Sequence, residues 1–119
     1  GGDPKGTWVS AYAAQRLALD NLDLDAPALG TQFGILTVDE WLGICFWDPV
    51  VHTWDLGQAA GISGLPADDL CAAALELLTH VETTANMRLP FVFAEALEPA
   101  SDTPKDQLIA LVGRSATWR

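Results

Sequence analysis

The chain has 119 residues, half of them hydrophobic, and carries 16 acidic against 6 basic residues. This length fits one domain, and the hydrophobic share is large enough to build a packed core. The net charge of −10 disfavours nucleic acids and anionic membrane surfaces as partners, because both attract clusters of Lys and Arg. Without a long apolar run or a signal-peptide pattern, the sequence indicates a cytoplasmic protein.

The first half of the chain predicts two helices. Thr7 is placed to cap a helix from about residue 8 to residue 22, and residues 23–34, rich in Asp, Pro and Gly, are expected to be irregular. Thr37 and Glu40 have the spacing of a capping box. They predict a long helix from residue 38 to about residue 60, ending at Gly61.

The second half predicts two more helices. Pro66 opens one that runs to about residue 85, and residues 86–103 read as an irregular connection with a short extended piece at 90–93. A last helix begins near residue 103 and ends near Gly113. Four apolar-striped helices without a convincing strand pair predict an all-α fold, with residues 1–119 as a single helical domain.

The two cysteines, Cys45 and Cys71, both lie inside apolar helical patterns. We expect two buried thiols that act as small hydrophobic residues, with a disulfide as the alternative.

One segment of the long helix carries polar groups suited to chemistry. Asp48 and His52 are four residues apart and Asp55 follows three later, so the three side chains share one line of the helix. A carboxylate and an imidazole at this spacing can bind one divalent ion. Asp48 and His52 are therefore candidate metal ligands, and Asp55 is a secondary candidate. The alternative is a hydrogen-bonded pair in which the carboxylate fixes the imidazole tautomer.

Aromatic residues on the same helix suggest a second kind of site. Trp47 and Trp54 are expected to pack in the core, or alternatively to form the wall of a ligand pocket. The other histidine, His80, follows Glu76 by four residues, and we expect a surface pair there.

Three segments carry a resemblance to a known family. They are Phe33-Gly34 with Thr37-Val38, residues 48–56 (DPVVHTWDL) with Ala59-Ala60-Gly61, and residues 106–114 with Trp118. In this order and spacing they resemble the DinB-like, mycothiol-dependent maleylpyruvate isomerase superfamily of metal-binding helical bundles.

The resemblance implies a four-helix bundle in which Asp48 and His52 match two of three ligands to a zinc or nickel ion. In that family the third ligand is a His on an earlier helix, whereas no His precedes Asp48 in this chain. We therefore expect an N-terminally truncated relative whose bundle is incomplete in one chain. Apolar helix faces left without cover favour association, so we expect a homodimer that completes the bundle.

Two functions compete on this evidence. The first is a non-catalytic helical domain that binds a small molecule or a partner through the Trp-rich helix, with Asp48, His52 and Asp55 as a polar network. The second is a metal-dependent, thiol-using transferase or isomerase. We favour the first, because two ligands on one helix do not make a catalytic zinc site. A fragment of a longer enzyme is a third possibility.

Overall fold

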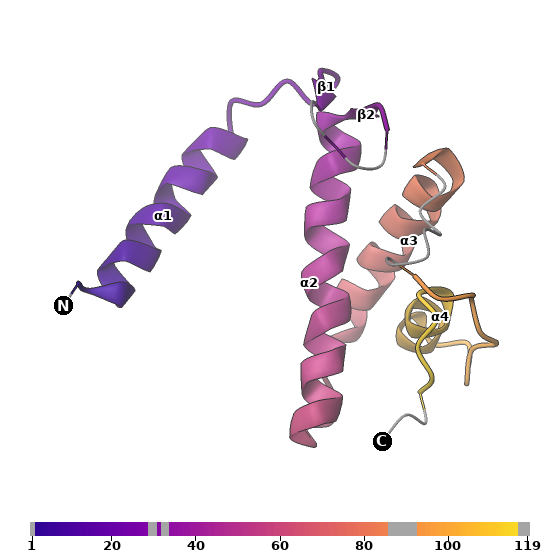
Figure 1. The fold of residues 1–119 in the computed structure, drawn as a ribbon. Helices are drawn as coiled ribbons and strands as arrows, with labels where there is room; N and C mark the ends of the chain where they lie inside the picture. The colour runs from indigo at the N-terminus through magenta and orange to yellow at the C-terminus, as the bar shows by residue number, and fades with distance from the viewer. Residues whose placement is uncertain (1, 29–30, 32–33, 86–92, 117–119) are drawn as a thin grey trace.

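The computed structural model describes residues 2–28, 31, 34–85 and 93–116. The elements in chain order are α1 (Pro4–Leu19), β1 (Pro27–Ala28), β2 (Leu36–Thr37), α2 (Val38–Ala60), α3 (Asp68–Ala85) and α4 (Pro104–Leu111). Figure 1 shows α1 standing apart, while α2, α3 and α4 lie together. The predicted all-α class is confirmed. None of the described helices is long and apolar enough to cross a membrane.

The bounds of α2 agree with the sequence signals. The Thr37 hydroxyl accepts a hydrogen bond from the Glu40 amide at 3.2 Å, and the Thr37 amide donates to Glu40 Oε2 at 2.8 Å. These bonds satisfy two of the amides that a helix N-terminus leaves unpaired. At the other end Gly61 adopts a left-handed conformation with φ 66° and ends the helix.

α4 begins where predicted, with Thr103 as its N-cap, whereas α1 and α3 begin at different residues from those predicted. α1 starts at Pro4, which tolerates the first helical turn because its missing N–H would be unpaired there anyway. Thr7 is consequently inside the helix, and its hydroxyl donates to the Asp3 carbonyl at 2.9 Å. α3 starts at Asp68, two residues after Pro66. The extended piece predicted at 90–93 lies mostly outside the described residues, as do Phe33 and Trp118.

A short strand pair corrects the expectation of a fold without strands. β1 and β2 pair antiparallel, with Pro27 opposite Thr37 and Ala28 opposite Leu36. The chain before β1 then accepts from the first turn of α2: the amide of Val38 donates to the Ala26 carbonyl at 2.8 Å and that of Asp39 to the Leu24 carbonyl at 3.1 Å. The unpaired amides of the α2 N-terminus therefore hold this segment in place.

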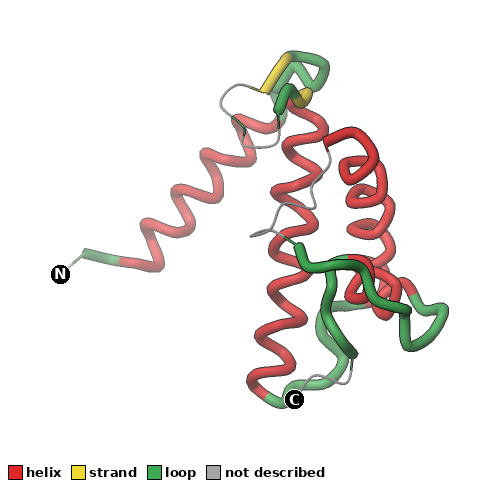
Figure 2. The backbone as a smooth tube through the Cα atoms, turned by 45° about the vertical axis from the view of Figure 1, so that its right-hand side comes forward, coloured by secondary structure: helices red, strands yellow, loops and turns green. Residues whose placement is uncertain are grey.

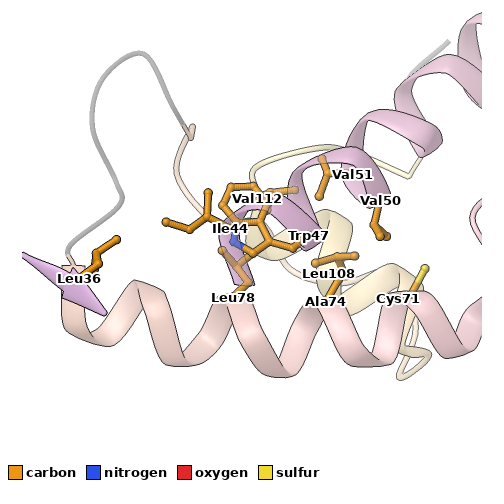
Figure 3. Packing of buried hydrophobic residues seen from close by; sticks show 10 residues of the cluster. All are labelled: Leu36, Ile44, Trp47, Val50, Val51, Cys71, Ala74, Leu78, Leu108 and Val112. Atoms are coloured by element: carbon orange, nitrogen blue, oxygen red, sulfur yellow. The ribbon is translucent and has the colours of Figure 1, made fainter. Parts of the chain in front are cut away.

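The core lies where α3 packs against α2 and α4 (Figures 2 and 3). The Trp47 ring packs against Phe93 with 5.2 Å between ring centroids. The buried cluster consists of Leu36, Ile44, Trp47, Val50, Val51, Cys71, Ala74, Leu78, Leu108 and Val112. Three helices and the residues beside β2 thus share one apolar centre, to which α1 contributes no buried residue.

The two thiols differ in environment, which corrects one of the two expectations. Cys71 is buried in the core, and this burial raises the pKa of its thiol. Cys45, by contrast, is exposed on α2. Both thiols are free.

The core packing makes a prediction about Leu78, which is 1% exposed. Leu78→Ala removes several buried contacts and leaves a cavity, so it should lower the free energy of unfolding by about 2–5 kcal/mol. Urea unfolding followed by circular dichroism measures this loss. The control is Leu17→Ala on α1, where the side chain is 68% exposed and the change should stay within about 0.5 kcal/mol. Equal losses in the two variants would contradict this assignment of the core.

Candidate functional site

The three polar residues predicted on α2 do come together. His52 Nδ1 lies 3.0 Å from Asp55 Oδ2, and His52 Nε2 lies 3.6 Å from Asp48 Oδ1. The imidazole therefore stands between two carboxylates, one a turn before it and one a turn after it. The side chains of His52 and Asp48 are 58% and 55% exposed, so solvent and ions reach them.

Asp55 has a second partner that the sequence did not indicate. Arg114 Nε donates to Asp55 Oδ1 at 2.7 Å, and Arg114 Nη2 donates to Asp55 Oδ2 at 2.9 Å. This two-point geometry is the strong form of an Arg–carboxylate pair. It connects the turn after α4 to the C-terminal third of α2, across 59 residues of sequence.

Gly113 sets the path of the chain into Arg114. Its φ is 76°, a left-handed conformation that favours glycine. A Cβ atom at this position would lie 2.7 Å from Ala94 Cβ and 3.0 Å from the Ala94 carbonyl, so the space also requires glycine. The Arg114 amide donates back to the Ile109 carbonyl at 2.9 Å, which closes the end of α4. Gly113 was predicted as the helix end, but nothing in the sequence indicated which side chain the following Arg would meet.

The electrostatics of Asp55 follow from these contacts. Burial alone would raise the pKa of its carboxyl, but the hydrogen bonds and charges of Arg114 and His52 outweigh burial and lower the pKa below its ordinary value of 3.8. Asp55 is therefore ionised at neutral pH, and both of its oxygens are engaged. This leaves Asp48 and His52 as the metal candidates. Within the described residues, no group of three or more His, Cys, Asp or Glu side chains is placed to hold a metal ion.

A pocket of about 420 Å³ opens beside the Asp55–Arg114 pair. Its lining residues are Trp54, Asp55, Leu97, Gly113, Arg114 and Ser115. Trp54 is thus a buried residue that also lines this pocket, and its role as the wall of a ligand site stays a prediction. Trp47 lies in the core, away from this pocket, and its indole N–H has no acceptor among the described residues.

His80 forms a surface pair of the expected kind, and the partner found for it lies on another helix. Its Nε2 lies 3.8 Å from Glu40 Oε1, so the carboxylate that closes the α2 capping box also faces α3. The spacing in the sequence had predicted Glu76, on the same helix as His80, as the partner of this pair.

Comparison of the chain with protein-family models, curated proteins and solved structures gave no match. The DinB-like relationship therefore stays a prediction that rests on the three sequence segments.

The ion pair makes a prediction about pH. Arg114→Ala should lower the free energy of unfolding by about 1 kcal/mol at pH 7, a value reduced for the partial exposure of the pair. The lowered pKa of Asp55 means that its pairing stabilises the fold above pH 3.8 and that this contribution is lost as the pH falls through the folded-state pKa. The difference between the parent and Arg114→Ala should therefore shrink towards pH 2, as measured by urea unfolding across the pH range.

Asp48→Asn is the matched control, since its carboxylate is exposed and meets no Arg among the described residues. It should change the free energy of unfolding by less than about 0.5 kcal/mol. A double-mutant cycle with Asp55→Asn isolates the pair. A coupling energy of zero would show that the pair does not contribute to stability.

Proposed function

We propose that this chain is a non-catalytic, DinB-like helical domain that binds a small, largely apolar molecule in the pocket beside Trp54 and Arg114. The observation that carries the proposal is the pocket itself, which holds about 420 Å³. Sites for small molecules range from about 300 to 1,000 Å³ and combine apolar walls with a few placed polar groups. Trp54 and Leu97 are the apolar walls here, and the Asp55–Arg114 pair is the polar edge.

The polar edge indicates the chemistry of the ligand. Asp55 neutralises much of the Arg114 charge, so a strongly charged ligand would have to compete with an ion pair at 2.7 and 2.9 Å. Arg114 has five N–H donors, of which two go to Asp55 and one to the Val112 carbonyl at 3.4 Å. A molecule with an apolar body and one acceptor group, such as a carbonyl or a single carboxylate, fits these walls and donors.

One observation favours a second candidate, a divalent-metal-dependent transferase or isomerase that uses a thiol. Asp48 Oδ1 and His52 Nε2 are 3.6 Å apart and exposed, a separation that two ligands of one ion can have at about 2 Å each. A bound zinc or nickel ion would supply Lewis-acid chemistry. Since the described residues supply two such ligands and a catalytic zinc takes three, we rank this function second. A cytoplasmic location and a homodimer belong to both proposals.

The pocket proposal is tested with the dye 8-anilinonaphthalene-1-sulfonate, an aromatic body with one anionic group. The parent chain should bind it saturably, one molecule per chain. Leu97→Trp adds bulk to the pocket wall at an exposed position, so it should weaken binding at least about tenfold, the equivalent of 1.4 kcal/mol. Fluorescence titration measures the affinity. Leu17→Trp introduces the same ring on α1 and should bind as the parent does; equal affinity in both variants would refute the pocket.

The metal candidate makes a different prediction. Isothermal titration of tag-free protein with zinc alone should give one site per chain if Asp48 and His52 are ligands, and His52→Ala should abolish it. His80→Ala keeps the zinc site and controls for surface histidines. An absence of binding by the parent chain excludes this function. Dye binding that persists in the presence of a chelator supports the non-catalytic domain.

A further inference from the structure

α1 packs against none of the other described helices of its chain. None of its 16 residues is buried, and Figures 1 and 2 show it extending away from the other helices. Trp8, Tyr12 and Leu19 follow one another at spacings of four and seven, so they line one face. Trp8 is 70% and Tyr12 is 53% exposed. A helix of this length is marginal alone in water and normally depends on packing of its apolar face.

A groove of about 440 Å³ lies on the side of α2 that faces away from α4. Cys45, Pro49 and Thr53 form its α2 wall, and Leu65 and Leu70 form the opposite wall. Leu56, one turn beyond Thr53 and largely exposed, extends the apolar surface along α2. A helix ridge of three apolar side chains is the shape that such a groove accepts.

The charges of α1 and of the groove are also complementary. α1 contains Lys5 and Arg16 and no Asp or Glu, so it carries +2, which leaves −12 on the rest of the chain. The two cations are eleven residues apart, three helical turns, and thus lie along one side of the Trp8–Tyr12 face. Neither forms an ion pair with any described residue. On the groove side, Asp69 directly precedes Leu70 and is exposed, whereas Asp48 lies on the His52–Asp55 line of α2, away from the groove wall.

The connection between α1 and α2 is hydrogen-bonded to both helices. The amides of Asp20, Asn21 and Leu22 donate to carbonyls in the last turn of α1, and the Asn21 side chain donates to the Leu17 carbonyl at 3.0 Å. Shortly afterwards the carbonyls of Leu24 and Ala26 are bound by the first turn of α2. The connection is thus short and hydrogen-bonded at both ends, and the apolar face of α1 stays exposed.

We propose that α1 of one chain packs into the Cys45–Leu70 groove of a second copy, and that the exchange is reciprocal. The resulting homodimer buries Trp8, Tyr12 and Leu19 and gives each core an additional helix. A two-fold arrangement satisfies both unpartnered surfaces at once, because each chain supplies one helix and one groove. This contact specifies the homodimer of the proposed function and rests on it in that respect. Its surface shares no lining residue with the Trp54–Arg114 pocket, so loss of the dimer and loss of ligand binding are measured separately.

A disulfide trap tests the contact directly. Cys45 is the exposed native thiol on the groove wall, whereas Cys71 is buried. Tyr12→Cys should therefore form a covalent dimer of twice the 12.7 kDa chain mass under mild oxidation, seen on a non-reducing gel. Leu17→Cys, on the opposite side of α1, should form much less of it. Adding Cys45→Ser should remove the dimer, which excludes a link between two introduced thiols. A disulfide formed within one chain would overturn the proposal, since α1 would then occupy its own groove.

Sedimentation velocity of the unmodified chain provides the second measurement. The parent and Leu17→Ala should sediment as dimers at micromolar concentration, and the double variant W8A/Y12A should sediment as a monomer. A monomeric parent, or a W8A/Y12A dimer of unchanged affinity, would overturn the proposal. Dye binding to the same variants reports separately on the pocket.

Discussion

The two-point ion pair between Arg114 and Asp55 is the contact on which the site depends. It joins the turn after α4 to the C-terminal third of α2, and residues of both segments line the pocket. The pair also determines what Asp55 can do. A carboxylate held at 2.7 and 2.9 Å by a guanidinium, with a lowered pKa, serves as a structural anion that fixes both Arg114 and the His52 ring, and is poorly suited to act as a metal ligand.

Local signals in the sequence predicted the helices well where the chemistry is local. The capping box at Thr37 and the left-handed Gly61 fix both ends of α2, because each acts within one helical turn. The line of Asp48, His52 and Asp55 was predictable for the same reason, since helical geometry alone brings them together. The start of α1 was wrong because Thr7 is a good cap in isolation, whereas Pro4 at the first turn extends the helix upstream.

Most of the other missed features depend on contacts between different elements of the fold. Arg114 meets Asp55 only because Gly113 turns the chain against Ala94, which no periodicity reveals. The β1–β2 pair has two residues per strand, too few for an alternating pattern to show. His80 was expected to pair along its own helix, yet the packing of α3 on α2 brings Glu40 within 3.8 Å. Cys45 looked buried because the apolar pattern of α2 continues around the helix, including a side that is exposed among the described residues.

That uncovered side of α2 gives the helix two distinct roles. One side supplies Ile44, Trp47 and Val51 to the core, and the opposite side presents Cys45, Pro49 and Leu56 to solvent. An apolar pattern that continues onto an exposed side is typical of a surface that another helix covers. α1 has the matching property: it carries exposed apolar side chains and two cations, and none of its residues is buried. The Asp55–Arg114 pocket and the groove are lined by different residues of α2. Small-molecule binding and chain association therefore use different sides of this helix, and one sequence can support both.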